Sequence, residues 1–206
     1  MKSIEPTELR YPNCLFRAWK GHLLRPVWIR MYRGPFGLED LQRRNQEVDG
    51  YGFAEWFTSV YFHLQNYTVI RGGYFKEERP IFPQALAVVG ANGMQVLQNI
   101  SHSQPPDLLV LPASGKFFFV EAKRGRDRVS KTQAAAFSMI EEELKCRVKV
   151  GHLTKVKTIE ASSRPEECKK AMDECELLDE KLVALFTKHI GENGGSVQLE
   201  ADGKCR

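Results

Sequence analysis

The run Phe117-Phe-Phe-Val-Glu-Ala-Lys123 places the strongest constraint on what this chain can fold into. Side chains of a strand alternate between its two faces, so Phe119, Glu121 and Lys123 share one face. Both faces are apolar until Glu121, which is typical of a central strand covered on both sides. The sequence therefore predicts an α/β fold with a central sheet flanked by helices. It also predicts a carboxylate and an ammonium group near the end of this strand.

The segments around this strand have the patterns of further helices and strands. Apolar residues recur at helical spacing over 53–65, and the capping-box pattern Ser130-Lys-Thr-Gln133 opens a helix that runs to about Cys146. The other expected elements are strands at 67–70, 108–111, 117–122 and 147–156, a helix at 83–100 weakened by Gly90 and Gly93, and a helix from Ser163 to Gly191. Their order predicts a mixed sheet.

We expect four parts along the chain. Residues 1–46 are rich in proline and glycine and are expected to form an N-terminal basic and aromatic extension, irregular with short helical pieces. Residues 47–160 are expected to form the α/β core, and residues 161–190 a C-terminal helix. Residues 191–206 are rich in glycine and polar residues and are expected to be a disordered tail.

Composition excludes several classes of protein. No run of 18 or more apolar residues is present, and the first residues lack the apolar stretch of a secretory signal, so we expect no membrane partner. The five cysteines are odd in number and never spaced as C-x-x-C, which argues against a disulfide framework or a zinc site. We therefore expect a cytoplasmic protein, associated with the nucleoid in a bacterium or nuclear in a eukaryote.

The net charge of +4 is unevenly distributed. Residues 160–206 hold 7 Lys/Arg against 11 Asp/Glu, a net −4, and residues 1–159 hold 23 against 15, a net +8. A segment without acidic residues alternates basic side chains (Arg10, Arg17, Lys20, Arg25, Arg30 and Arg33) with aromatic ones (Tyr11, Phe16, Trp19, Trp28 and Tyr32). Such interleaving is typical of nucleic-acid binding, although the aromatic residues could equally belong to the core beneath a solvated basic surface.

A second carboxylate is expected to approach the first. Asp107 begins the strand before Glu121, directly after Pro106, and a hairpin would bring the two side chains together. The ends of strands in α/β sheets are common positions for functional sites. Two carboxylates suit a hard cation such as Mg²⁺, and Lys123 could position or activate a water beside it. The alternative is an ordinary strand end with an exposed Glu121–Lys123 ion pair.

These residues resemble a known family. Pro106-Asp107, a spacer of 13 residues and Glu121-Ala122-Lys123 resemble the PD-(D/E)XK nuclease signature. The longer pattern, which continues through Asp127-Arg-Val-Ser130-x-x-Gln133, is similar to the VRR-NUC branch of that superfamily. The resemblance covers about residues 100–156, and it leaves the N-terminal segment and the C-terminal helix unexplained.

The resemblance implies a restriction-endonuclease-like core that hydrolyses phosphodiesters with one or two metal ions. Asp107, Glu121 and the carbonyl of Ala122 would bind Mg²⁺ or Mn²⁺, and Lys123 would act on the attacking water. The family often adds an acidic residue from the helix before the first strand, here Glu55, with Glu47 as the second choice. Exposed helical glutamates are common, so Glu55 could also be an ordinary surface residue.

Other residues near the pattern have two possible roles each. Gln133 matches a helix glutamine that supports the site in the family, and it could also complete the capping box with Ser130. Arg124, Arg126, Arg128 and Lys131 are candidates for phosphate contacts, together with Arg17, Lys20, Arg25, Arg30 and Arg33, or else they serve solubility.

The functional hypothesis is a metal-dependent endonuclease acting on DNA. Its expected substrates are flap, branched or junction DNA, in repair, recombination, or a phage or defence setting. The alternatives are a catalytically silent scaffold that binds nucleic acid and an RNA-directed nuclease. The expected helix at 161–190 could pair two copies into a homodimer, or it could cover the sheet of its own chain.

Overall fold

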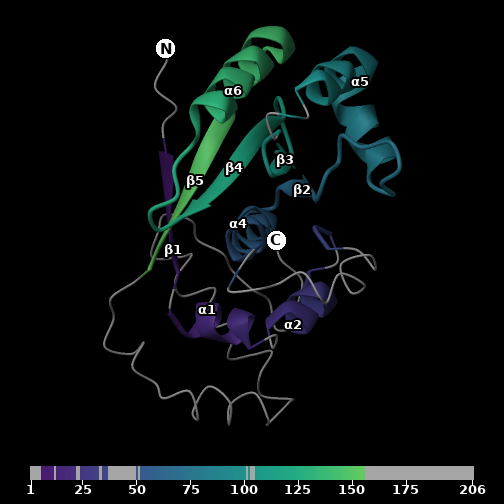
Figure 1. Cartoon of the computed structure of the whole chain (residues 1–206). Coiled ribbons are helices and arrows are strands. Elements are labelled where there is room, and N and C mark those ends of the chain that lie inside the picture. Colours follow the sequence, from purple (N-terminus) through teal and green to yellow (C-terminus); the bar gives the residue numbers. More distant parts are fainter. Residues whose placement is uncertain are drawn as a thin grey trace.

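The structure is a computed structural model that describes residues 6–11, 13–21, 24–32, 34–36, 50, 52–100, 102 and 105–155. Figure 1 shows the path of the chain through these elements. In chain order they are β1 (Pro6–Tyr11), α1 (Asn13–Lys20), α2 (Leu24–Met31), α4 (Phe53–Leu64), β2 (Thr68–Arg71), α5 (Phe82–Asn99), β3 (Leu108–Leu111), β4 (Phe118–Arg124), α6 (Lys131–Leu144) and β5 (Val148–Lys155).

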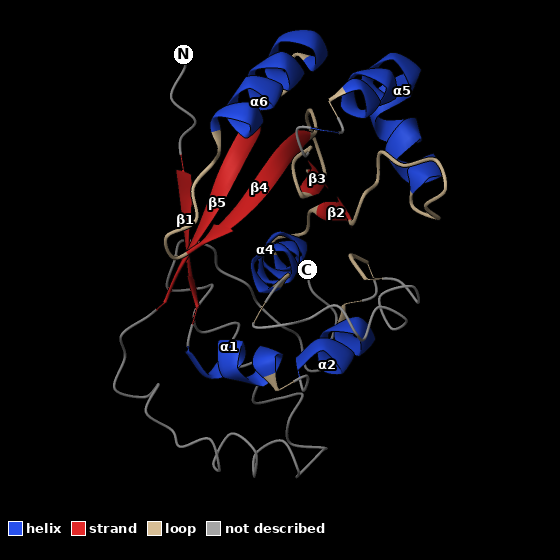
Figure 2. Cartoon of the chain, in the orientation of Figure 1, coloured by secondary structure: helices blue, strands red, loops and turns tan. Residues whose placement is uncertain are grey.

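The strands form one five-stranded sheet in the order β1-β5-β4-β3-β2. Strand β3 pairs antiparallel with β2 and with β4, whereas β5 pairs parallel with β4 and with β1. Figure 2 shows the sheet with helices on its two sides. The expectation of a mixed sheet flanked by helices is therefore confirmed.

The two faces of the sheet are covered by different helices (Figure 1). On one face, Leu109 and Phe119 pack with α5 and with Phe137 and Ile140 of α6. On the other face lies α4, and α1 and α2 extend this layer into an aromatic core. Strand β4 is therefore buried on both faces, which explains its unbroken apolar run.

Helix α4 lies close against the sheet because small groups face each other at the contact. Thr58 and Ser59 are fully buried on the helix. A Cβ atom built on Gly151 of β5 would lie only 3.3 Å from Leu9 Cδ1 and 3.4 Å from Thr58 Cγ2. This close packing fixes the start of α4, including Glu55 in its first turn, relative to the sheet edge.

The N-terminal segment differs from the irregular structure that the sequence suggested. It supplies the edge strand β1, which pairs with β5 from Pro6↔Val150 to Tyr11↔Lys155. Its aromatic residues are core residues, because Tyr11, Trp19, Trp28 and Tyr32 are all buried. Of the two interpretations of these rings, packing in the core is the one that the structure supports.

Arg25 does not have the surface position expected of a phosphate contact. Arg25 is 7% exposed, and its guanidinium lies 5.1 Å from the centre of the Trp56 ring. The cation is buried because it packs on an aromatic face within the layer formed by α2 and α4. The structure therefore places Arg25 within this packed layer rather than on the exposed surface.

Several expected elements agree closely with the structure. Strand β3 has the expected bounds, and α6 begins with the expected capping box at Ser130 and Gln133. Helix α5 is bent at Gly90, where φ is 80° and ψ is 163°, so the weak point expected there is a kink. The expected helix at 161–190, the tail at 191–206, Glu47 and Arg33 lie outside the described residues. Within the described ranges, no helix combines the length and apolar character needed to cross a bilayer.

Candidate functional site

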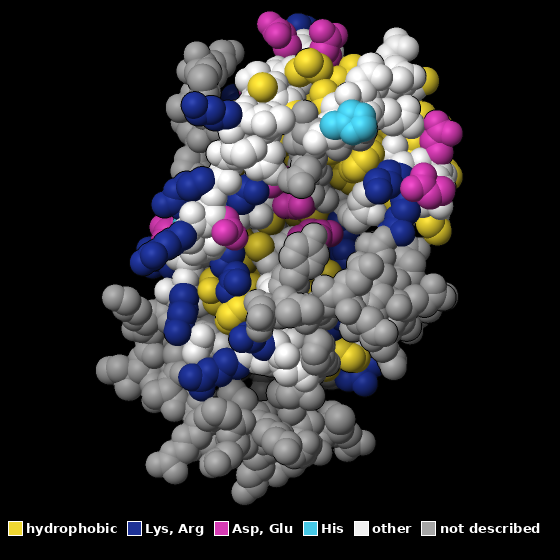
Figure 3. All heavy atoms as spheres, viewed as in Figure 1, with side chains coloured by type: hydrophobic (Ala, Val, Ile, Leu, Met, Phe, Trp, Pro, Cys, Tyr) yellow, Lys and Arg dark blue, Asp and Glu magenta, His cyan; other side chains and the backbone are white. Residues whose placement is uncertain are grey.

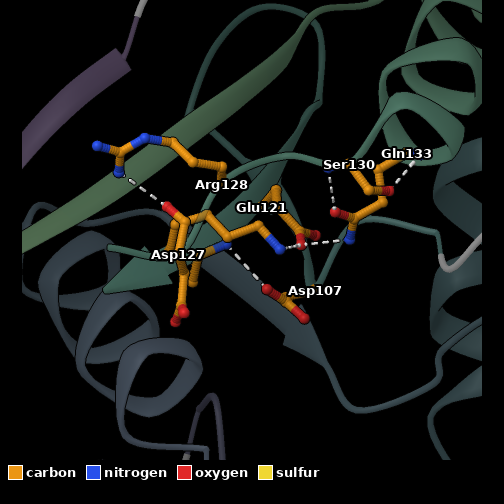
Figure 4. A network of polar contacts seen from close by, with 8 residues as sticks. Asp107, Glu121, Asp127, Arg128, Ser130 and Gln133 are labelled. Atoms are coloured by element: carbon orange, nitrogen blue, oxygen red, sulfur yellow. Dashed lines mark hydrogen bonds and ion pairs between the residues drawn. The ribbon is translucent and has the colours of Figure 1, made fainter. Parts of the chain in front are cut away.

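The hairpin of β3 and β4 brings Asp107 opposite Glu121. The register pairs Leu108 with Val120 and Leu109 with Phe119, so the next residues outward are Asp107 and Glu121. Leu109 and Phe119 pack in the core beneath α5 and α6, and alternation places both carboxylates on that same face. Figure 4 shows the two acidic side chains at this edge of the sheet. The approach expected from the sequence is therefore present.

The peptide of Ala122 is bound by Asp107. Strand β3 begins at Leu108, so β4 extends past its partner at this point. The carboxylate of Asp107 replaces the backbone acceptor that a longer β3 would provide, because Ala122 N–H donates to Oδ2 at 2.8 Å. The N–H and C=O of a strand residue face the same side, so the carbonyl of Ala122 also faces the side of Asp107.

Glu121 is held by a cation and by an amide. It is 3% exposed, and its Oε1 lies 2.6 Å from Lys123 Nζ and 2.8 Å from Gln133 Nε2. The other end of the Gln133 amide accepts from Ser130 N–H at 3.2 Å, while Ser130 Oγ accepts from Gln133 N–H at 3.1 Å. Gln133 thus completes the capping box and contacts the candidate site at once, as Figure 4 shows.

Glu55 approaches the pair from the other layer. It lies in the first turn of α4, and its Oε1 is 3.2 Å from Arg71 Nη1 at the end of β2. The guanidinium of Arg71 lies over the rings of Trp56, at 4.4 Å, and Phe36, at 5.1 Å. Sequence reasoning missed Arg71. The only local signal is a basic residue ending a short β-rich run before Gly72-Gly73, and nothing in that signal points to Glu55.

Electrostatics show how tightly the acidic groups are gathered. Burial raises the pKa of Asp107 well above the usual value of an aspartate, and the charges of Glu121 and Glu55 raise it further. The Ala122 N–H and the charge of Lys123 act in the opposite direction. Three carboxyl groups thus interact at one edge of the sheet, an arrangement that a cation would stabilise.

A buried tyrosine anchors the backbone in front of Asp107. Tyr74 is fully buried, and its hydroxyl donates to the carbonyl of Pro106 at 2.9 Å. Its ring stacks on Phe119 at 6.1 Å. Burial raises the pKa of Tyr74 well above 10.0, and the charges of Asp107 and Glu121 add to that shift. The hydroxyl therefore stays protonated and keeps its bond to Pro106.

The donor set fits a hard cation better than a soft one. In the described part of the chain no group of three or more His, Cys, Asp or Glu residues is arranged to hold a metal ion. The oxygen donors that converge are the carboxylates of Asp107 and Glu121, with the carbonyl of Ala122 on the same side. Carboxylate and carbonyl oxygens are ligands that Mg²⁺ and Mn²⁺ accept, so these residues fit such an ion.

Basic side chains occur on several described elements, and some of them are held by other groups. Arg126, Arg128 and Lys131 are exposed, as are Arg17, Lys20 and Arg30 of the N-terminal helices. Arg128 Nη1 donates to the carbonyls of Gly125 and Asp127 and lies 3.3 Å from His152 Nε2. The guanidinium of Arg124 lies 3.9 Å from the centre of the Phe16 ring. Figure 3 shows Lys and Arg side chains along one flank of a face whose middle holds acidic side chains.

Comparison with known proteins gives no relative. No family model matches the chain, and no match was found among the curated proteins or the solved structures.

Proposed function

We propose that this protein is a metal-dependent nuclease that hydrolyses phosphodiester bonds in DNA. One observation carries the proposal. Asp107 and Glu121 lie opposite each other at the edge of the β3–β4 hairpin, Asp107 accepts a hydrogen bond from Ala122 N–H, and Lys123 lies on the same strand as Glu121. Two carboxylates, a backbone carbonyl and an amine at one edge are groups that metal-assisted phosphodiester hydrolysis can use.

The proposed fold is a restriction-endonuclease-like core of the VRR-NUC type. The order of the elements supports it, because an antiparallel hairpin carries the acidic pair and a capped helix, α6, leads on to a parallel strand. The Gln133 contact to Glu121 also supports it, since the resemblance implies a glutamine at that place on the helix.

Each residue has a proposed role. Asp107, Glu121 and the carbonyl of Ala122 would hold Mg²⁺ or Mn²⁺. When bound, the ion would supply Lewis-acid activation of the phosphodiester. The ammonium of Lys123 would position the attacking water and stabilise negative charge on the phosphate. Gln133 would keep the carboxylate of Glu121 in place by its hydrogen bond.

The proposed substrate is a nucleic acid because cations lie along one flank of the face that holds the acidic edge. Arg126, Arg128 and Lys131 follow β4 directly and are exposed near the site, so they are suited to contact phosphates. Flap, branched or junction DNA is the substrate that we propose first. RNA would offer the same phosphodiester chemistry, and it belongs in the same assay.

The test is to incubate the purified full-length protein with a panel of substrates and to measure cleavage. The panel contains linear, single-stranded, flap and four-way DNA, and RNA. Cutting should require Mg²⁺ or Mn²⁺ and stop with EDTA. Asp107→Asn and Lys123→Ala should each lower the rate by about 10²–10³-fold or more, because each removes a group that acts on the reacting phosphate. Glu78→Gln, which changes an exposed carboxylate in the loop after β2, is the matched control and should cut normally.

Cleavage that survives EDTA and both substitutions would contradict the proposal. DNA binding without cutting, under all metal conditions, would instead indicate a silent scaffold with a nuclease fold.

A further inference from the structure

Two carboxylates at the candidate site are paired with cations, but the two cations are held very differently. Lys123 reaches Glu121 from two positions along the same strand, and its side chain is 15% exposed. Arg71 reaches Glu55 from another element, and its side chain is only 6% exposed. The two cations therefore differ in how easily each can leave its carboxylate.

Among the described residues, the charged contact of Lys123 is with Glu121, and the ammonium that makes it ends a flexible side chain. Its ammonium is a compact charge on four methylene groups, so it can move from Glu121 Oε1 to another acceptor with a rotation of its own side chain. A metal ion could therefore replace it on Glu121 without any change in the backbone.

Arg71 is fixed by packing as well as by charge. Its planar guanidinium lies over the Trp56 ring at 4.4 Å and over the Phe36 ring at 5.1 Å. These rings are themselves stacked at 4.2 Å with an interplanar angle of 17°. To release Glu55, the guanidinium would have to leave its aromatic contacts and a buried position, which costs cation–π and packing energy.

Glu55 is nevertheless close to the acidic pair. Its charge acts on the carboxyl group of Asp107, so it lies within electrostatic range of the proposed metal ligands. The carboxylate is thus near enough to influence a cation there, while one of its oxygens is bound to Arg71.

We propose that Arg71 is a positioning residue that withholds Glu55 from the metal, so that the site takes one divalent cation rather than two. Glu55 then acts on the cation through its charge and not as a ligand. This inference rests on the proposed metal-dependent function, because it specifies how many ions the same site holds.

The test is a titration of the full-length protein with Mn²⁺ alone. Binding is measured by calorimetry and by the electron paramagnetic resonance signal of free Mn²⁺. The wild-type protein should bind one equivalent. Asp107→Asn and Glu121→Gln should weaken binding by more than about 100-fold, beyond what loss of a supporting residue usually costs. Glu55→Gln should weaken it by less than about tenfold, since only a nearby charge is lost. Glu78→Gln is the control for loss of an exposed carboxylate.

A double-mutant cycle tests the role of Arg71 directly. Arg71→Met removes the guanidinium that contacts Glu55, and it should increase Mn²⁺ affinity at least about tenfold or add a second equivalent. In that background Glu55→Gln should cost more than about 100-fold at the site that Glu55 has joined, although it costs little when Arg71 is present. Circular dichroism checks that Arg71→Met is folded. If it is not, the wild-type stoichiometry and the Glu55→Gln result decide the question.

The outcomes separate the two proposals. A wild-type protein that binds no Mn²⁺ would overturn the proposed function and this inference with it. Two equivalents bound by the wild type would overturn only the inference. So would a Glu55→Gln loss as large as that of Asp107→Asn, or an Arg71→Met protein that is folded and binds Mn²⁺ as the wild type does.

Discussion

The carboxylates on the two sides of the sheet are held in different ways. On the α6 face, Glu121 is held by Lys123 and Gln133, which lie within 12 residues of it in the sequence. On the α4 face, Glu55 is held by Arg71, and Arg71 lies over rings that come from α4 and from the N-terminal segment. One half of the site is therefore built from a local motif, and the other half depends on tertiary packing.

Removing one large ring from each face gives the largest expected effect. Trp56→Ala on the α4 side and Phe137→Ala on the α6 side should each lower the free energy of unfolding by about 3–5 kcal/mol, because both rings are buried. Urea denaturation measures this loss. Only Trp56→Ala removes a ring from Arg71, so it alone should increase the effect of Glu55→Gln on Mn²⁺ binding. An equal increase with Phe137→Ala would contradict the difference between the faces.

Tyr74→Phe tests the anchor on the α6 face. The change removes the hydroxyl that donates to Pro106 and leaves that buried carbonyl without its donor. The free energy of unfolding should fall by about 1–3 kcal/mol, as for a buried acceptor left unpaired. Thermal or urea unfolding measures the change. A fall below about 0.5 kcal/mol would mean that the bond contributes little to the folded state.

Ser130→Ala and Gln133→Ala separate the capping box from the site. Each removes part of the cap and should cost about 0.5–2 kcal/mol of stability. Only Gln133→Ala also removes the donor to Glu121, so it alone should weaken Mn²⁺ binding, by about 10–100-fold. Ser130→Ala is thus the matched control for loss of the cap. Equal metal affinity in the two variants would contradict a supporting role for Gln133.

The smallest effect concerns the pH dependence of stability. The pKa of Asp107 is raised in the folded state, so its contribution to stability is fully present below the unfolded value near 3.8 and is lost as pH rises through the folded pKa. Asp107→Asn removes this loss. Without divalent cations, the variant should melt above the wild type at pH 7 and the difference should shrink toward pH 4. A wild type that is the more stable at pH 7 would contradict the shift.

The local half of the site is also the half that could be predicted from the sequence. The acidic pair lies on a hairpin whose apolar alternation and turn are continuous in the sequence, so the meeting of Asp107 and Glu121 could be predicted. The same holds for Ser130 and Gln133, because a capping box is a pattern of neighbouring residues.

The other half of the site had no such local pattern. Arg71 pairs with Glu55 across 16 residues and takes its orientation from Phe36 and Trp56, so only the folded layer brings them together. The burial of Arg25 could not be predicted for the same reason, since a basic residue among aromatic ones could be solvated or stacked. Strand β1 was missed although Glu8, Leu9, Arg10 and Tyr11 alternate in polarity, because prolines on either side suggested an irregular segment.

The pairing of β1 with β5 has a consequence for how the protein is synthesised. One edge strand of the sheet starts at residue 6, and its hydrogen-bond partners begin at Val150. During synthesis on the ribosome, β1 therefore has no strand to pair with until nearly all the other described elements have emerged. Contacts of such long sequence separation slow folding and leave an unpaired strand exposed in the meantime. The charged side chains of Glu8 and Arg10 lie along the unpaired β1, and they disfavour its pairing with another chain before β5 is synthesised.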